Sequence, residues 1–178
     1  MTLEAPAGYT PIDNNQINPI ELAGLVFAAA PDWGEQSAEL WRQKLVRPNL
    51  IALGLVDASS GLAAAATMEV SADNKCVQLS ELAVAEAHRR LGLGTYLVEA
   101  RVGLADDLGI EQTRAIFKET NMMLDVYRQL GFQITSGTYG VRYRPDLQQV
   151  QGVDVVRPAV WQAADYFEKF AAAYGLNR

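Results

Sequence analysis

The chain is poor in the residues on which several kinds of catalytic and binding site depend. Its 178 residues include one cysteine, Cys76, and one histidine, His88. A single cysteine excludes an internal disulfide and supplies no framework for a metal. A single histidine argues against a Ser–His–Asp triad and against a metal site built from imidazoles. We therefore expect no bound metal.

Long hydrophobic runs and an excess of positive charge are also missing. The apolar stretches "LVFAAA" (25–30) and "LAAAA" (62–66) are much shorter than a membrane span. The N-terminal residues show no basic segment followed by an apolar one, so we expect no secretory signal and a cytoplasmic location. The net charge is −6, which disfavours a general nucleic-acid-binding surface. The sequence thus predicts neither a membrane nor a nucleic-acid partner.

What is present suits a single folded domain over residues 1–178. Apolar residues make up 49% of the chain and charged residues 20%, as in ordinary globular proteins. Hydrophobic periodicity and turn residues predict helices at 18–30, 37–46, 93–109 and 121–131, and strands at 50–57, 62–70, 76–84, 112–117 and 132–135. Three antiparallel strands followed by helical crossovers predict an α/β fold, a mixed sheet with helices on its faces.

Residues 143–178 are predicted to extend a core that spans about residues 8–140. A strand is predicted at 150–158, and a helix with aromatic residues along one side is predicted at 159–175. This C-terminal helix either packs on the domain or forms a contact in a homodimer. The sequence alone does not decide between the two.

The stretch "HRRLGLGTY", residues 88–96, lies between the predicted strand 76–84 and the helix that follows. Glycine at a helix start costs about 0.5–1 kcal/mol relative to alanine. Either the chain simply turns there, or a ligand comes close to the backbone. Amide groups at a helix N-terminus lack intrahelical partners and attract anions, and Arg89 and Arg90 add positive charge. The spacing is neither that of a Walker A loop nor that of a dinucleotide fingerprint.

Two motifs together resemble the GNAT superfamily of N-acetyltransferases. The arrangement Arg89-x-x-Gly92-x-Gly94 after a strand is similar to the signature Gln/Arg-x-x-Gly-x-Gly/Ala of that family. The second motif, Tyr127-x-x-x-Gly131-Phe132, closes the next helix as "Y-x-x-x-G-F" does in the family. The resemblance covers about residues 8–140. It implies a mixed sheet of about seven strands, flanked by helices and splayed between the fourth and fifth strands.

In that family, the loop amides bind the pyrophosphate of acetyl-CoA, and the end of the preceding strand pairs with the pantetheine arm. The resemblance therefore implies acetyl-CoA as cosubstrate. It implies that the cofactor is bound by Leu82, Ala83, Val84, Arg89, Arg90, Leu91, Gly92, Leu93, Gly94, Thr95, Thr120 and Asn121. This sequence departs from the family at Thr120 and Met123, where asparagine and alanine are common. Met123 is expected to narrow the space beside the pantetheine.

Tyr127 is the candidate general acid, because its position in the motif implies a phenol near the sulfur of coenzyme A. Transfer of an acetyl group to an amine requires a proton for the departing thiolate, and a positioned acid supplies it. The alternative is that Tyr127 is a core aromatic residue whose hydroxyl is satisfied by a hydrogen bond.

Glu81 is the candidate general base. Strand alternation predicts that it shares one face with Val77, Leu79 and Ala83, and a carboxyl buried on such an apolar face would have a raised pKa. The alternative is a carboxylate at the rim, or one paired with an arginine such as Arg114.

The resemblance implies an acyltransferase that moves an acetyl group from acetyl-CoA to a primary amine by direct attack, without a covalent intermediate. The acceptor, a small molecule or a protein amine, is not identified by the sequence. Two other functions remain open. One is an acyl-CoA-binding sensor that has lost turnover, which Thr120 and Met123 favour. The other is an interaction module that uses the C-terminal helix.

Overall fold

The computed structural model describes residues 3–31, 36–117, 123–135 and 139–148. The chain divides into two compact units, residues 1–148 and 149–178, and all described residues belong to the first. The predicted strand at 150–158 and the predicted helix at 159–175 lie outside the described residues, as do Thr120 and Asn121. The single domain over residues 1–178 stays a prediction.

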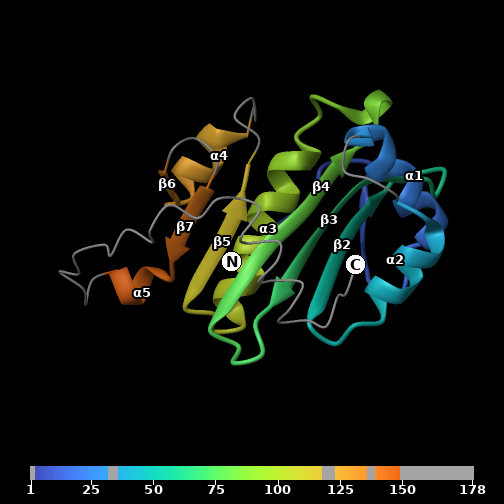
Figure 1. Cartoon of the computed structure of the whole chain (residues 1–178). Coiled ribbons are helices and arrows are strands. Elements are labelled where there is room, and N and C mark those ends of the chain that lie inside the picture. The colour runs from blue at the N-terminus through green and yellow to red at the C-terminus, as the bar shows by residue number, and fades with distance from the viewer. Residues whose placement is uncertain (1–2, 32–35, 118–122, 136–138, 149–178) are drawn as a thin grey trace. The chain divides into compact units, whose positions relative to one another are not determined.

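Seven strands of the described residues form one mixed sheet in the order β1-β2-β3-β4-β5-β7-β6 (Figure 1). All neighbours are antiparallel except β4 and β5, which are parallel and joined through α3. The strands are β1 (Thr10–Asp13), β2 (Leu50–Val56), β3 (Leu62–Val70), β4 (Cys76–Val84), β5 (Gln112–Ile116), β6 (Gln133–Thr135) and β7 (Tyr139–Tyr143). The predicted α/β class with a mixed sheet is confirmed.

Helices cover both faces of this sheet. They are α1 (Pro19–Ala29), α2 (Ala38–Leu45), α3 (Leu93–Asp107), α4 (Leu124–Gln129) and the short α5 (Pro145–Gln148). Alternate residues of β3 separate the two faces, because Ala65 packs in the cluster of α1 and α2, whereas Ala64 and Ala66 pack in that of α3. The strand β3 is therefore buried on both sides, which its largely apolar sequence allows.

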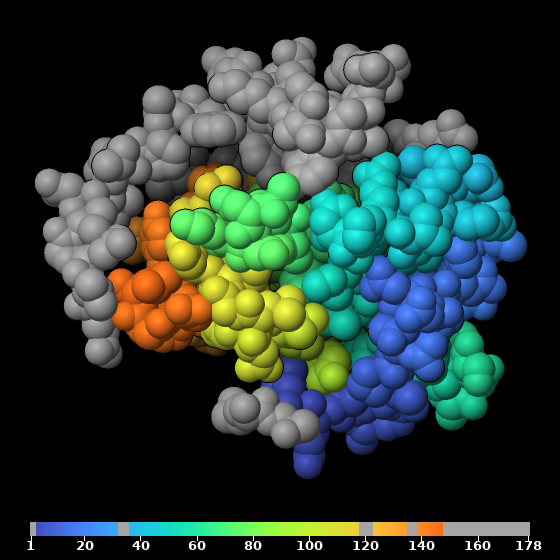
Figure 2. Space-filling model, turned by 90° about the horizontal axis from the view of Figure 1, so that it is seen from below, coloured from blue at the N-terminus to red at the C-terminus, as the bar shows by residue number. Residues whose placement is uncertain are grey.

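The end of the sheet at which β4 and β5 begin is visible in Figure 2. The β3–β4 turn (71–75, green) lies beside the connection from α3 to β5 (yellow). The backbone N–H groups of Glu111 and Gln112 both donate to the carbonyl of Lys75, at 3.1 and 3.0 Å. These bonds hold the starts of the two parallel strands together.

Two strands were not predicted from the sequence. The strand β1 is a short edge strand that contains Pro11, and prolines and short length both weaken a strand pattern. The strand β7 lies inside the sheet although its sequence, "YGVRY", includes a glycine and an arginine. Arg142 is satisfied there by a bidentate ion pair with Asp106 of α3, 2.7 Å for each bond, and by the carbonyl of Leu130 at 2.8 Å.

The strand β4 contains a β-bulge at Ser80–Glu81. The register changes from Met68↔Leu79 to Ala66↔Leu82, so that one residue of β3, Thr67, faces two residues of β4. An extra residue shifts the alternation of side chains by one position beyond the bulge.

The bulge corrects the predicted face of β4. Leu79 packs in the core cluster of α3, whereas Ala83 packs in the cluster of α1 and α2. The prediction that Val77, Leu79, Glu81 and Ala83 share one face is therefore wrong. The side chain of Glu81 contacts Lys44 of α2, so it lies on the α1/α2 face, opposite Leu79.

The strands β4 and β5 part within their length. Their parallel pairing ends at Leu79↔Ala115, although β4 continues to Val84. The expected separation of the fourth and fifth strands is thereby confirmed. It begins at the bulge and leaves one edge of the last residues of β4 without a strand partner in the described residues.

Gly140 of β7 lies close to the rings of Phe117 and Phe132, so even a small side chain at this position should be destabilising. A Cβ at Gly140 would lie 2.8 Å from Cε2 and 3.0 Å from Cζ of Phe117. We expect Gly140→Ala to lower the free energy of unfolding by about 1–3 kcal/mol through overpacking, measured by urea denaturation. The control is Gly103→Ala at an exposed position of helix α3, where a Cβ would meet no atom within 4 Å. It should stabilise the protein by about 0.5–1 kcal/mol. Equal effects of the two substitutions would contradict the packing argument.

Candidate active site

The end of β4 directs backbone groups toward the place where β5 has moved away. The N–H of Ala85 donates to the carbonyl of Ala63 in β3, at 2.9 Å. Successive residues of a strand direct their backbone groups to alternate sides. The N–H and C=O groups of Leu82 and Val84 therefore point away from β3, toward the gap between β4 and β5. An extended ligand could pair with them as a further strand.

The loop between β4 and α3 ends in two residues with left-handed backbone conformation. Gly92, with φ of 82°, is the N-cap of α3, and Arg90 has φ of 67°. No side chain caps the helix, so the first-turn N–H groups, those of Leu93, Gly94 and Thr95, have no intrahelical partner. The side chain of Leu93 is buried in the core, whereas those of Arg89, Arg90 and Leu91 are exposed. The predicted residues thus form an anion-attracting helix end beside β4.

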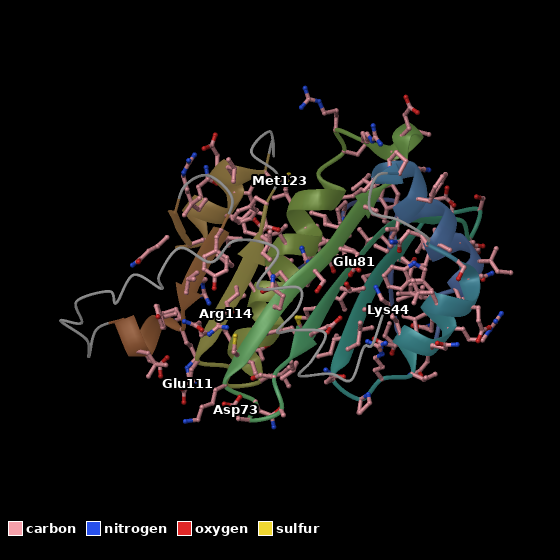
Figure 3. All side chains as sticks on the ribbon, viewed as in Figure 1. Lys44, Asp73, Glu81, Glu111, Arg114 and Met123 are labelled. Atoms are coloured by element: carbon pink, nitrogen blue, oxygen red, sulfur yellow. The ribbon has the colours of Figure 1, made fainter. Side chains whose placement is uncertain are left out.

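The two glycines of this loop serve different needs. A Cβ at Gly92 would meet nothing within 4 Å, so the requirement there is the positive φ. At Gly94, a Cβ would lie 3.7 Å from Cε of Met123 and 3.8 Å from Cγ2 of Val84. Gly94 therefore keeps open a narrow space between the end of β4 and Met123, which Figure 3 labels near the start of α3. The expected narrowing of the space beside the pantetheine by Met123 stays a prediction.

Contacts made by side chains of the loop, two of them with distant segments, fix the loop in place. Arg89 donates through Nε to the carbonyl of Val84 at 3.3 Å, so it lies beside the free edge of β4. His88, in the 3₁₀ helix η2 (Glu86–His88), forms a hydrogen bond between Nδ1 and the hydroxyl of Tyr9 at 2.9 Å. Its Nε2 lies 3.6 Å from Oδ2 of Asp57 in the β2–β3 turn. The sole histidine anchors the loop and the neighbouring turn.

Tyr127 is buried on the α3 side of the sheet. Its ring packs edge-on against Phe117 and Phe132, with centroid distances of 4.5 and 5.2 Å. It is only 4% exposed, and its hydroxyl interacts with the guanidinium of Arg101. The ring is part of the core, as one interpretation of the sequence expected. The role of its hydroxyl as an acid stays a prediction.

Glu81 is held in an ion pair on the opposite face of the sheet. Nζ of Lys44 lies 3.1 Å from Oε1, and the hydroxyl of Thr67 donates to Oε2. Figure 3 shows Lys44 on the α2 side of Glu81 and Arg114 on the β5 side. Burial raises the pKa of Glu81, but the charge of Lys44 and the hydrogen bond from Thr67 outweigh it, so the pKa is lowered. The expected raised pKa is therefore wrong, and the partner is a lysine, not an arginine.

A second carboxyl on this face, that of Glu69, was not predicted from the sequence to belong to the site. It follows Thr67 by two residues on β3 and is 7% exposed. Burial, followed by the charge of Glu81, raises the pKa of Glu69, against the opposing charges of Lys44 and Arg47. The signal in the sequence was an acidic residue inside the apolar strand "LAAAATMEV". The pKa values of these two carboxyls are thus shifted in opposite directions, that of Glu69 mainly by burial and that of Glu81 by Lys44 and Thr67.

Other features lie apart from the gap. Burial raises the pKa of the Cys76 thiol, which makes it a poor nucleophile. A surface hollow is lined by residues of the β1–α1 loop, α2 and the start of β2, including Asn14, Arg42 and Leu50, and by none of the predicted site residues. Within the described residues, no cluster of metal-ligating side chains occurs and no helix is long and apolar enough to cross a membrane.

The comparisons with known proteins agree with this geometry. A model of the acetyltransferase (GNAT) family matches residues 21–132. The fold is similar to that of the aminoglycoside 6'-N-acetyltransferase from Enterococcus faecium, with 18% identity, a TM-score of 0.61, and coverage of 76% of this chain and 96% of that one. It is also similar to a GNAT-family acetyltransferase from Staphylococcus aureus, with 13% identity, a TM-score of 0.63, and coverage of 76% and 98%.

A third similar structure contains a ligand. The PaiA N-acetyltransferase from Thermoplasma acidophilum, in complex with coenzyme A, shares 14% identity with this chain, with a TM-score of 0.60 and coverage of 76% of this chain and 98% of that one. No curated protein sequence matches the chain. At these identities, the solved structures establish a shared fold.

The ion pair of Lys44 and Glu81 predicts a pH-dependent loss of stability. The side chains are only 18% and 16% exposed. Lys44→Met would leave a buried carboxylate unpaired and should cost about 3 kcal/mol of unfolding free energy at pH 7. Because pairing lowers the pKa of Glu81 in the folded state, its stabilisation is present above the ordinary value of about 4.3 and is lost as the pH falls below it.

Urea denaturation of both proteins at several pH values measures this difference. The gap in stability between the wild type and Lys44→Met should narrow as the pH falls through the lowered pKa of Glu81, where the carboxyl becomes protonated. Lys44→Arg keeps the charge and serves as the control. A gap that is unchanged between pH 7 and pH 3 would show that the lost stability comes from packing of the lysine side chain.

Proposed function

Because the chain belongs to the acetyltransferase (GNAT) family, we propose that it transfers an acetyl group from acetyl-CoA to a primary amine. The observation that carries this proposal is the juxtaposition of two features at one end of β4. The free backbone edge of Leu82 and Val84 borders the gap to β5, and the uncapped, glycine-containing start of α3 follows it directly.

The residues at this end of β4 fit acetyl-CoA. The amides of Leu93, Gly94 and Thr95 would bind the pyrophosphate, with Arg89 and Arg90 adding positive charge. Leu82 and Val84 would pair with the amides of the pantetheine arm, with Ala83 between them bonded toward β3. We include Thr120 and Asn121 in the site on the resemblance alone, since they lie outside the described residues.

The two candidate proton carriers lie on opposite sides of the sheet, with the gap between them. Tyr127 belongs to the α3 side and Glu81 to the α2 side. An amine that enters from the α2 side would attack the thioester carbonyl directly. The C–S bond then breaks, and Tyr127 donates a proton to the sulfur. A covalent intermediate on Cys76 is not part of this proposal, because burial disfavours its thiolate.

We propose that Glu81 receives the proton of the amine through water. The pairing with Lys44 keeps Glu81 ionised at neutral pH, which makes it a ready but weak acceptor. Glu69, whose pKa is raised, is a second carboxyl that could take this proton.

The binding of acetyl-CoA tests the proposal. At one hundred times its dissociation constant, the ligand should add about 2.7 kcal/mol to the stability of the protein, visible as a rise in Tm. Gly94→Val should abolish this rise, because its extra methyl groups would occupy the space between Val84 and Met123. Gly94→Ala is the control, since a Cβ there makes only ordinary contacts. A wild-type protein that gains no stability from millimolar acetyl-CoA would refute both the enzyme and the sensor.

Turnover separates the enzyme from an acyl-CoA sensor. We expect Tyr127→Phe to bind acetyl-CoA normally but to lower kcat by about 10²–10⁴, the usual worth of a positioned acid. Tyr143→Phe is the control, because it removes a hydroxyl that accepts a hydrogen bond from Gln112 at 3.0 Å on β5. The measurement is thiol release with a panel of primary amines. If Tyr127→Phe keeps its rate and loses only stability, the hydroxyl has a structural role.

A further inference from the structure

Arg101 of α3 is a fully buried cation on the core side of the helix. Its exposure is 0%. A buried charge is costly unless other groups compensate it. Within the described residues, no carboxylate forms a hydrogen bond with its guanidinium, so it is not half of a buried ion pair. Its hydrogen-bond partners include four backbone carbonyls.

Those carbonyls belong to the β4 bulge and its surroundings. Nη1 of Arg101 donates to the carbonyl of Thr67 at 2.8 Å, and lies 3.4 and 3.5 Å from the carbonyls of Ser80 and Glu81. Nε donates to the carbonyl of Leu97, one turn earlier in α3, at 3.2 Å. A bulge leaves backbone groups without ladder partners. One guanidinium therefore satisfies the carbonyls at the point where β4 leaves β5.

The second terminal nitrogen of the guanidinium, Nη2, has a different environment. Nη2 is buried and has no hydrogen-bond partner of normal geometry within the described residues. The guanidinium also interacts with the Tyr127 side chain. Burial lowers the pKa of Arg101, and the hydroxyl of Tyr127 and the charge of Glu81 oppose that shift. The cation thus has donor capacity left over beside the tyrosine.

We propose that Arg101 is a positioning residue that couples the β4 bulge to Tyr127 during acetyl transfer. This proposal rests on the proposed function. When the C–S bond breaks, its electron pair passes to the sulfur, which takes the proton of the Tyr127 hydroxyl. The phenolate left behind is stabilised by the charge of Arg101 until it regains, by way of water, the proton that the amine nitrogen gave to Glu81. The same residue keeps the backbone of Leu82 in place beside the thioester.

A double-mutant cycle tests this coupling. Arg101→Met should lower kcat by about 10²-fold, the usual loss for one preorganised donor, while KM for acetyl-CoA changes less than about threefold. In the Tyr127→Phe background, where no phenolate forms, Arg101→Met should lower kcat only a few-fold. Arg101→Lys keeps the charge but not the planar fork, and should recover part of the rate in the wild-type background alone.

The outcomes distinguish this proposal from the proposed function. Each variant is first checked for a cooperative melt and for acetyl-CoA binding. If Arg101→Met does not fold, the cycle is run with Arg101→Lys, for which the loss must again be larger in the presence of Tyr127. Equal fold-losses in the two backgrounds would show a purely structural arginine and overturn the inference, while the acetyltransferase activity stands. A wild-type protein that binds acetyl-CoA but transfers no acetyl group to any amine would overturn both.

Discussion

One extra residue in β4 determines the arrangement of the whole site. The bulge at Ser80–Glu81 turns the side chain of Glu81 toward α2, ends the pairing with β5 at Leu79, and frees the backbone edge of the following residues. A regular strand would have placed Glu81 in the α3 core and continued the parallel ladder. One local irregularity thus has three consequences: the gap between the strands, the carboxylate beside it and the backbone edge. Arg101 donates hydrogen bonds to the carbonyls of this bulge from the other face of the sheet.

Charge on the two faces is arranged differently. On the α2 face, Lys44 neutralises Glu81 while Glu69 is left to burial, so one carboxyl holds its proton less tightly and its neighbour more tightly. On the α3 face, a cation without a carboxylate partner in the described residues adjoins a tyrosine. The α2 face is therefore suited to accept a proton from an ammonium group, and the α3 face is suited to stabilise an anion.

Local signals in the sequence predicted the elements whose cause is local. Asn18 caps α1, and its carboxamide oxygen accepts from the N–H of Ile20 at 3.0 Å, as the sequence "NPIEL" indicates. The loop from Arg89 to Gly94 was likewise found from its residues. The remaining features depend on distant partners. Arg142 makes β7 possible only because Asp106 meets it, and neither the bulge nor the pairing of Glu81 with Lys44 leaves a mark in the nearby sequence.

The hydrogen bond between Tyr9 and His88 has a consequence for the order in which parts of the protein fold. The two residues are 79 positions apart in the chain, and their hydrogen bond joins the start of the first strand to the loop before α3. Contacts between such distant residues form late in folding, because they close a long loop of chain. During refolding, this loop should therefore become ordered only after the meander of β2, β3 and β4 has formed. The affinity for an anionic ligand would then report the last step of assembly, when the N-terminal residues dock.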